Sequence, residues 1–303
     1  MRQPLLQAIL YRDGRLKPGW RICLFFFFFA SISIAGQLTV SVLPRDPLRW
    51  GYQVVSTLAA LLAGWIVLSR VDGRPIGALG FALHRKTLSE AIGGVAIGGL
   101  LIAAAILLLL STGAAAFSSD AGTLSGYFVF LGWTLLFFAL AAAWEEAIFR
   151  GYPFQVLVEW IGPWPATVLA SFIFSYLHGQ NPNVTSLALV NIFLAGILLS
   201  VAYLKTRSLW FVTGVHLGWN WTMASVFDLP VSGLGFDTPL YTGEPTGHQW
   251  WTGGAFGPEA GLAGTIVLLI GVAIFLLSKR IKQAPAMAKL GPIIDRRILS
   301  EPT

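Results

Sequence analysis

The chain alternates between long apolar runs and short polar segments. Roughly 20 consecutive apolar residues are needed to cross the hydrocarbon core of a bilayer as a helix. On this criterion the sequence predicts spans near residues 22–43, 50–69, 91–110, 127–160, 164–178, 186–204, 210–227 and 261–277. We therefore expect an all-α polytopic membrane protein with about eight transmembrane helices.

The charged residues outside these runs predict an orientation. Lys and Arg gather in the N-terminal segment, in the segments 70–86 and 205–207, and after residue 279, whereas the segments 111–126 and 228–260 contain neither. Basic segments remain on the cytoplasmic side of a membrane. We expect both termini to be cytoplasmic, with a basic interfacial segment 1–21, a single transmembrane domain 22–278 and a basic tail 279–303.

Composition supports a membrane protein and argues against other classes. Hydrophobic residues make up 55% of the chain and charged residues 11%, against about 25% charged residues in soluble domains. The net charge of +6 comes from residues that set orientation, so it does not predict a nucleic-acid partner. The expected surroundings are the lipid bilayer of a cell membrane, for which a bacterial inner membrane is our working assumption.

Three charges lie inside the fourth apolar run, in the sequence AWEEAIFRG. Each costs about 2.5–3.5 kcal/mol at bilayer depth, so such residues usually have a function. Glu146 and Arg150 are one helical turn apart with the acid first, the favourable order for an ion pair. Glu145 is rotated by about 100° from Glu146 and has no basic residue one turn away. Glu145 is therefore the candidate general base, and Glu146 a supporting residue held by Arg150.

Two further polar groups occur in later spans. His178 ends the fifth span, one turn after Phe174, and His216 and Asn220 share one face of the seventh. Gly162 and Pro163 predict a turn between the fourth and fifth spans. Glu145 and His178 lie at similar distances from this turn, so an antiparallel hairpin would place them at one depth. Taken singly, each group could be an ordinary packing contact; together they indicate a site.

The chemistry of these residues suits hydrolysis of an amide. A carboxylate and an imidazole can activate a water molecule, and His216 and Asn220 can donate hydrogen bonds to an oxyanion. Glu145, His178 and His216 could instead bind a catalytic zinc ion, although the HExxH signature is absent. We favour the metal-independent reading, with zinc as the only cofactor to consider.

The ordered motifs EExxxRG, FxxxH and HxxxN, within residues 145–220, resemble those of the CAAX-protease and bacteriocin-processing (Abi, CPBP) family of intramembrane proteases. The resemblance implies that Glu145 and His178 activate the water. It further implies that Glu146 and Arg150 support them, and that His216 and Asn220 stabilise the oxyanion. The sequence DGRP at 72–75, followed by LGF at 79–81, resembles another recurrent element of bacterial members.

The leading hypothesis is an intramembrane endopeptidase that cleaves a membrane-associated peptide or protein. Two alternatives stay open: a non-catalytic immunity or scaffold protein with the same fold, and a proton-coupled transporter that uses Glu145. A transporter needs a continuous polar path on both sides of the polar cluster. Because the sequence outward of the cluster is mostly Leu, Ala and Phe, the transporter is the less favoured of the two.

Overall fold

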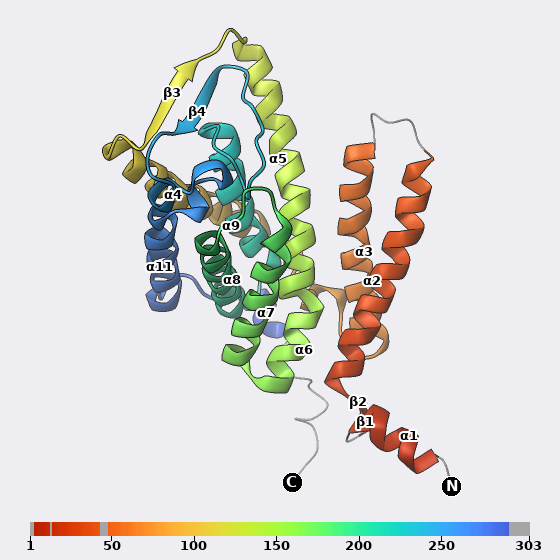
Figure 1. The fold of residues 1–303 in the computed structure, drawn as a ribbon. Coiled ribbons are helices and arrows are strands. Elements are labelled where there is room, and N and C mark those ends of the chain that lie inside the picture. Colours follow the sequence, from red (N-terminus) through yellow and green to blue (C-terminus); the bar gives the residue numbers. More distant parts are fainter. Residues whose placement is uncertain (1–2, 13, 43–47, 291–303) are drawn as a thin grey trace. The chain divides into compact units, whose positions relative to one another are not determined.

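The computed structural model describes residues 3–12, 14–42 and 48–290, and the chain is mostly helical (Figure 1). It divides into two compact units. The first unit contains residues 1–84, 143–166 and 284–303, and the second contains residues 85–142 and 167–283. The expectation of a single domain over 22–278 stays a prediction.

Each run expected to span the membrane is helical. The helices are α2 (Pro18–Ser41), α3 (Leu48–Arg70), α4 (Thr87–Ser111), α5 (Leu124–Glu146) continued by α6 (Tyr152–Ile161), α7 (Pro163–Leu177), α8 (Ser186–Thr206), α9 (Leu209–Trp221) and α11 (Leu262–Leu277). Among the described residues, five helices are long and apolar enough to cross a membrane: α2, α3 from Gly51, α4, the continuous α5–α6 and α8. The chain is thus a multi-pass membrane protein, while the count of eight spans and the orientation of the termini remain predictions.

The core of the first unit lies where α2, α3 and α6 meet. Phe25 of α2, Val67 of α3 and Val156 of α6 are fully buried there, and Tyr152 stacks on Phe25 with ring centroids 6.1 Å apart. The short 3₁₀ turn η1 (Ile76–Leu79) closes this core. Large aromatic and branched side chains bury much apolar surface here, so α6 is firmly packed just after the charged motif.

The ends of the first unit contain smaller elements. The segment 1–21 contains the helix α1 (Gln3–Leu10), which is followed by the short antiparallel strands β1 (Tyr11–Arg12) and β2 (Arg15–Leu16). The expected tail, residues 279–303, contains the short helix α12 (Pro285–Lys289), whose Met287 is buried. Residues 291–303 of that tail lie outside the described residues.

In the second unit, α4 and α9 approach each other through glycines. A side chain at Gly98 would place its Cβ 1.9 Å from the carbonyl oxygen of Val215, and one at Gly218 would lie 2.1 Å from that of Val95. Gly94 and Gly214 complete the seam. Small residues let helix backbones approach closely in this way, whereas Gly93 of the same helix has open space around it.

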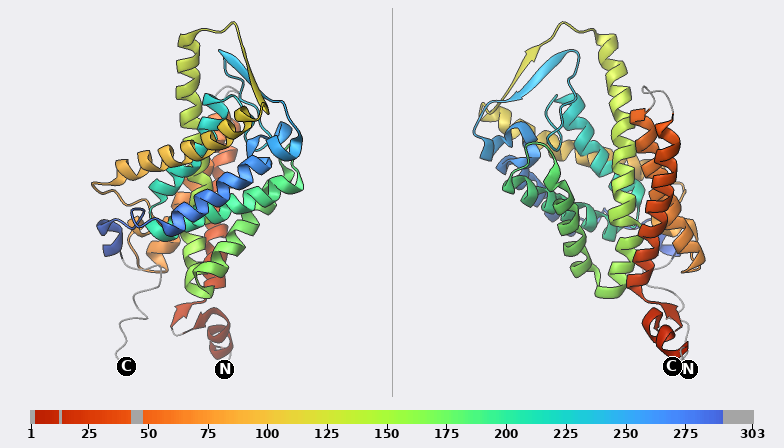
Figure 2. Two further views of the ribbon diagram at one scale, coloured as in Figure 1. Left: turned by 90° about the vertical axis from the view of Figure 1, so that its left-hand side faces the viewer. Right: turned by 45° about the vertical axis from the view of Figure 1, so that its right-hand side comes forward.

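The loops of the second unit include a sheet that the expected all-α class omitted. Strands β3 (Ala115–Ser119) and β4 (Tyr241–Pro245) pair antiparallel (Figures 1 and 2). The chain then forms the short helix α10 (Gln249–Thr252) and the 3₁₀ turns η5 (Gly254–Phe256) and η6 (Pro258–Ala260), and enters α11. The mostly helical class is confirmed, and the sheet is an addition in which segments far apart in sequence pair as strands outside the long helices.

Candidate functional site

The charged motif lies at the end of α5. Glu146 and Arg150 are both fully buried and form a salt bridge between Oε1 and Nη1 of 3.1 Å. This confirms the ion pair expected from the spacing. Glu145, the residue before, is half-buried. The pairing lets the apolar surroundings hold two opposite charges at one turn of the helix, since each offsets the burial cost of the other.

The helix is not regular after the motif. Residues Ala147–Gly151 form a π-helical turn, η2, and Gly151 leaves it with ψ of −135°. Pro153 then occupies the first turn of α6, where its missing N–H costs little. The irregularity of this helix therefore begins at Ala147, before Pro153 is reached. π-helical turns occur frequently at functional sites.

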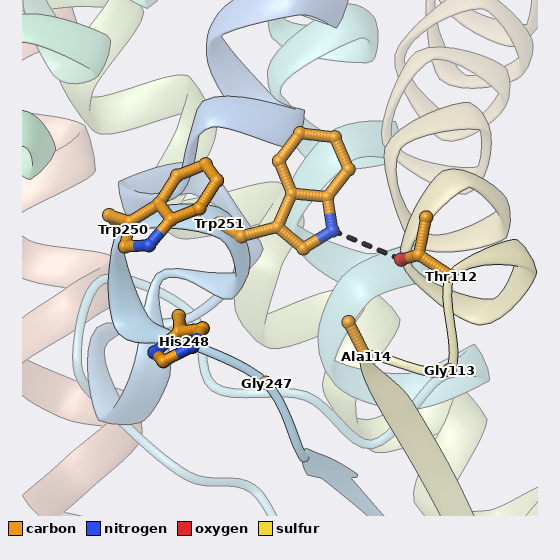
Figure 3. A pocket seen from close by; sticks show the side chains of 7 residues that line it. All are labelled: Thr112, Gly113, Ala114, Gly247, His248, Trp250 and Trp251. Carbon is orange, nitrogen blue, oxygen red and sulfur yellow. Dashed lines mark hydrogen bonds between the residues drawn. The ribbon is translucent and has the colours of Figure 1, made fainter.

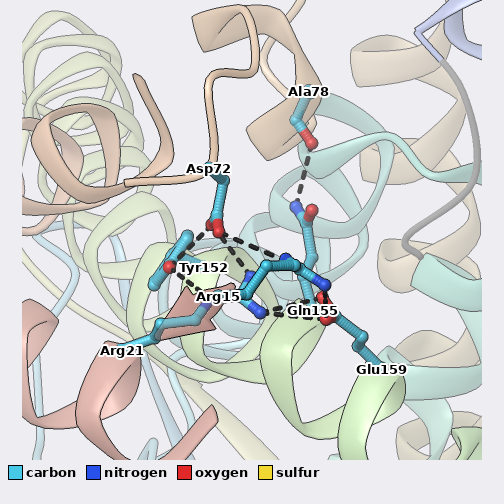
Figure 4. A network of polar contacts seen from close by, with 7 residues as sticks. All are labelled: Arg15, Arg21, Asp72, Ala78, Tyr152, Gln155 and Glu159. Carbon is cyan, nitrogen blue, oxygen red and sulfur yellow. Dashed lines mark hydrogen bonds and ion pairs between the residues drawn. The ribbon is translucent and has the colours of Figure 1, made fainter. Parts of the chain in front are cut away.

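A buried polar network fixes α6 within the first unit (Figure 4). Asp72 accepts hydrogen bonds from the Tyr152 hydroxyl at 2.7 Å and from Nη2 of Arg21 at 2.9 Å. Arg21 also contacts both carboxylate oxygens of Glu159 at 3.0 Å, and Arg15 donates to Glu159 at 2.8 Å. Two basic and two acidic groups thus join α2, the loop after α3 and α6 into one frame around the start of α6.

The loop 72–79 is also hydrogen-bonded to α6. Gln155 of α6 is buried and donates from Nε2 to the carbonyl oxygens of Ala78 and Leu79, at 2.9 and 3.1 Å. The loop picked out by its sequence, 72–81, therefore packs on the helix that follows the charged motif. Its role in the structure is to hold α6.

The turn expected at Gly162 is present, because α6 ends at Ile161, Gly162 has φ of +87°, and α7 begins at Pro163. His178 follows the last residue of α7. Its Nδ1 lies 2.7 Å from the carbonyl oxygen of Phe174. A carbonyl oxygen only accepts, so Nδ1 carries the proton and the lone pair of the neutral ring is at Nε2. His178 is held in the tautomer that a general base needs.

Phe174 lies close to two of the histidines of the second unit, His178 and His216. Its buried ring lies 4.5 Å from the ring of His178 and 6.4 Å from that of His216, edge to face with the latter. On α9, His216 is two residues from Gly214 and from Gly218, so it projects about 200° away from the glycine seam. The packing on α4 thus directs His216 to the opposite face of α9, which it shares with Asn220.

One acidic residue that sequence reasoning assigned to an external loop is buried beside this group. Glu259 of η6 accepts hydrogen bonds from Ser232 and from the indole of Trp219, the residue before Asn220. Burial raises the pKa of Glu259, and the donors and the nearby His178 oppose that rise. Its only sequence signal was its place in the segment AFGPEAG, next to the last apolar run.

The predicted site residues therefore fall into two groups. Glu145, Glu146 and Arg150 belong to the first unit, and His178, His216 and Asn220 belong to the second. The structure brings together Glu146 with Arg150, and His178 with His216 through Phe174. The convergence of Glu145 with His178 stays a prediction.

The zinc alternative can be compared with the arrangement of possible ligands in the structure. Across the part of the chain that the structure describes, no group of three or more His, Cys, Asp or Glu side chains is arranged to hold a metal ion.

An open cavity of about 340 Å³ lies apart from these residues, between the end of α4 and α10 (Figure 3). His248 and Trp250 stack along one side of it, and Trp251 donates a hydrogen bond to Thr112 at 3.0 Å. None of the six predicted site residues lines it. The aromatic rings at the end of an apolar helix are typical of a membrane interface.

Residues 127–222 match the model of the family described as type II CAAX prenyl endopeptidase Rce1-like. The matched stretch is an Rce1-like domain, and it contains all six predicted site residues. Comparison with curated proteins gave no match.

Proposed function

We propose, from the Rce1-like domain, that this protein is an intramembrane endopeptidase that hydrolyses a peptide bond of a membrane-associated peptide or protein with a water molecule activated by Glu145 and His178. The observation that carries the proposal is that residues 127–222, the matched domain, enclose the charged motif and both histidine motifs. Membership in this family implies a membrane protease, and the residue roles are our proposal.

In the proposed reaction, Glu145 takes a proton from water while the water oxygen attacks the carbonyl carbon of the substrate. His178 orients the water through Nε2, because its Nδ1–H is occupied by the carbonyl oxygen of Phe174. The carbonyl oxygen becomes an oxyanion, to which His216 and Asn220 donate hydrogen bonds. The proton then passes from Glu145 to the leaving nitrogen, the C–N bond breaks, and a carboxylate and an amine are released.

The neighbouring ion pair has a supporting part in this scheme. Arg150 and Glu146 are both fully buried and compensate each other, and this ion pair fixes the helical turn that follows Glu145. Loss of Arg150 would leave the buried Glu146 without the charge that compensates it, which would disturb this turn. The ion pair thereby helps to hold Glu145 in position.

The test is a cleavage assay with a quenched fluorescent peptide library on protein reconstituted in liposomes. Glu145→Gln, His178→Ala and His216→Ala should each reduce the rate by about 100-fold or more, as expected for general-base and oxyanion groups. Asn220→Ala should reduce kcat while KM stays the same. Tyr176→Phe, an exposed position of α7, is the matched control and should keep full activity.

Two outcomes would overturn the proposal. One is equal cleavage by wild type and all site variants, which would indicate a contaminating protease. The other is no cleavage by a folded wild-type protein with any library member, which would favour a non-catalytic role. A parallel sample treated with a strong chelator decides the metal question, because a metal-independent site keeps its activity.

A further inference from the structure

The proposed reaction does not use Glu259, yet this carboxylate is buried and hydrogen-bonded within the second unit. It is only 8% exposed, and burying a carboxylate is costly unless hydrogen bonds compensate. Within the described residues, every partner assigned to its two oxygens is a hydrogen-bond donor. An acceptor-only group, an ionised carboxylate, fits this position.

One oxygen of Glu259 holds the loop that packs behind His178. Its Oε1 accepts from the backbone N–H and the hydroxyl of Ser232, both at 2.6 Å. The carbonyl oxygen of Ser232 accepts in turn from Asn181 Nδ2 at 3.2 Å, and the N–H of Asn181 donates to the carbonyl oxygen of His178 at 3.0 Å. Glu259 is thus connected to the 3₁₀ turn that begins at His178.

The approach between these two loops leaves no room for a side chain. Gly233, next to Ser232, has φ of +83°, and a Cβ there would lie 2.0 Å from the carbonyl oxygen of Pro182. The loop that Glu259 holds is therefore in direct backbone contact with the segment after His178. A shift of this loop would be transmitted to that segment because both are close-packed.

The other oxygen of Glu259 holds α9. Its Oε2 accepts from Nε1 of Trp219 at 3.3 Å, and Trp219 lies between His216 and Asn220. The backbone of Glu259 is itself fixed, because Asn191 of α8 donates to its carbonyl oxygen at 2.8 Å. The carboxylate is therefore held in one position, in which it contacts both Ser232 and Trp219.

We propose that Glu259 is a positioning residue for the two histidines, joining the segment of His178 to the helix of His216 through one buried carboxylate. This inference rests on the proposed function. Glu259 contacts neither the substrate nor the reacting atoms in this scheme; it sets the distance between the two elements that do.

The first test is Glu259→Gln, compared with Glu244→Gln at an exposed position of β4. The glutamine keeps the size of the side chain and can accept from Ser232, but it presents an NH₂ group to the N–H of Trp219. We expect kcat to fall about tenfold or more, because misplacement of catalytic groups by about 1 Å is costly, with KM unchanged. Glu244→Gln should match wild type. A raised KM with unchanged kcat would overturn the proposal by making Glu259 a substrate contact.

A double-mutant cycle tests the contact itself. Trp219→Phe keeps an aromatic ring and removes the N–H donor. If Glu259 acts through Trp219, the double variant Glu259→Gln/Trp219→Phe should lose no more kcat than the worse single variant. Fully additive losses would show that the two residues act independently, and the proposal would fall.

A readout without activity separates this proposal from the proposed function. Histidine carbethoxylation, followed by mass spectrometry, reports the accessibility of each of the chain's four histidines. Glu259→Gln should speed labelling of His178 and His216 and leave His84 and His248 unchanged. This selective change supports positioning even if no peptide is cleaved, and its absence overturns positioning even if cleavage is confirmed. If Glu259→Gln speeds labelling of all four histidines, the variant Trp219→Phe is labelled in the same way. Faster labelling of His216 alone in that variant supports the proposal, and unchanged or general labelling overturns it.

Discussion

The glycine seam between α4 and α9 makes a single methyl group a severe perturbation. In Gly98→Ala, the new Cβ would lie 1.9 Å from the carbonyl oxygen of Val215 and 2.9 Å from the nitrogen of Trp219. Real Cβ atoms essentially never come closer than 3.0 Å to such atoms. The two helices must therefore separate locally by about 1 Å, a distance that close-packed interiors do not absorb without loss.

The energetic cost follows from two opposing terms. Inserting a methyl group into a well-packed contact typically costs about 1–3 kcal/mol, and the upper part of this range applies because the obstructing atoms belong to the backbone. Alanine stabilises a helix by about 1 kcal/mol relative to glycine. We expect Gly98→Ala to lower the free energy of unfolding by about 2 kcal/mol. Because α9 carries His216, peptide cleavage should fall as well.

The assay is equilibrium unfolding in mixed detergent micelles, followed by circular dichroism. The matched control is Gly93→Ala on the same helix, where a Cβ would have nothing within 4 Å and only the helix-propensity gain remains. Gly93→Ala should be as stable as wild type or slightly more so. The reciprocal variant Gly218→Ala, whose Cβ would lie 2.1 Å from the carbonyl oxygen of Val95, should lose stability as Gly98→Ala does. Equal stability of Gly93→Ala and Gly98→Ala would refute the close approach of α4 and α9.

Three further predictions concern charged groups. Arg150→Met removes the partner of the buried Glu146 and should cost about 3–5 kcal/mol of unfolding free energy, partly recovered by adding Glu146→Gln; no recovery would argue against the pair. Glu159→Gln should cost about 1.5–3 kcal/mol in the same assay by weakening its bonds to Arg21, and an unchanged midpoint would contradict this. Burial raises the pKa of Asp228, so its contribution to stability is present below about pH 4 and lost as pH rises through the raised value. Asp228→Asn should therefore flatten the fall in melting temperature from pH 4 to 7, and a slope equal to that of wild type would contradict the assignment.

The sequence was sufficient where a local rule decides the structure. The apolar runs predicted each long helix, because a span needs a continuous apolar stretch. Gly162 and Pro163 predicted the turn between α6 and α7, and the spacing of Glu146 and Arg150 predicted a salt bridge that the structure contains. These features depend on residues a few positions apart.

The sequence was insufficient where distant segments meet. Strand β3 pairs with β4, which lies more than 100 residues later, and neither segment has a marked strand pattern. Glu259 appeared to be an ordinary loop acid because its donors, Ser232 and Trp219, come from other parts of the chain. The same reason applies to Asp72 in the loop after α3, whose partner Arg21 lies in α2.

The π-helical turns that follow Glu146 and Asn220 have the same structural consequence. Such a turn accommodates one extra residue, so the side chains after it are rotated by about 100° relative to a regular helix. After Glu146, the turn η2 allows Tyr152 to reach Asp72. After Asn220, the π-helical turn η4 (Thr222–Val226) allows the hydroxyl of Ser225 to donate to Thr134 of α5 at 2.8 Å. A regular helix would rotate each anchoring side chain away from its partner when the motif before it is held in place. Each turn therefore lets one helix direct its polar motif and its anchoring side chain toward their respective partners at the same time.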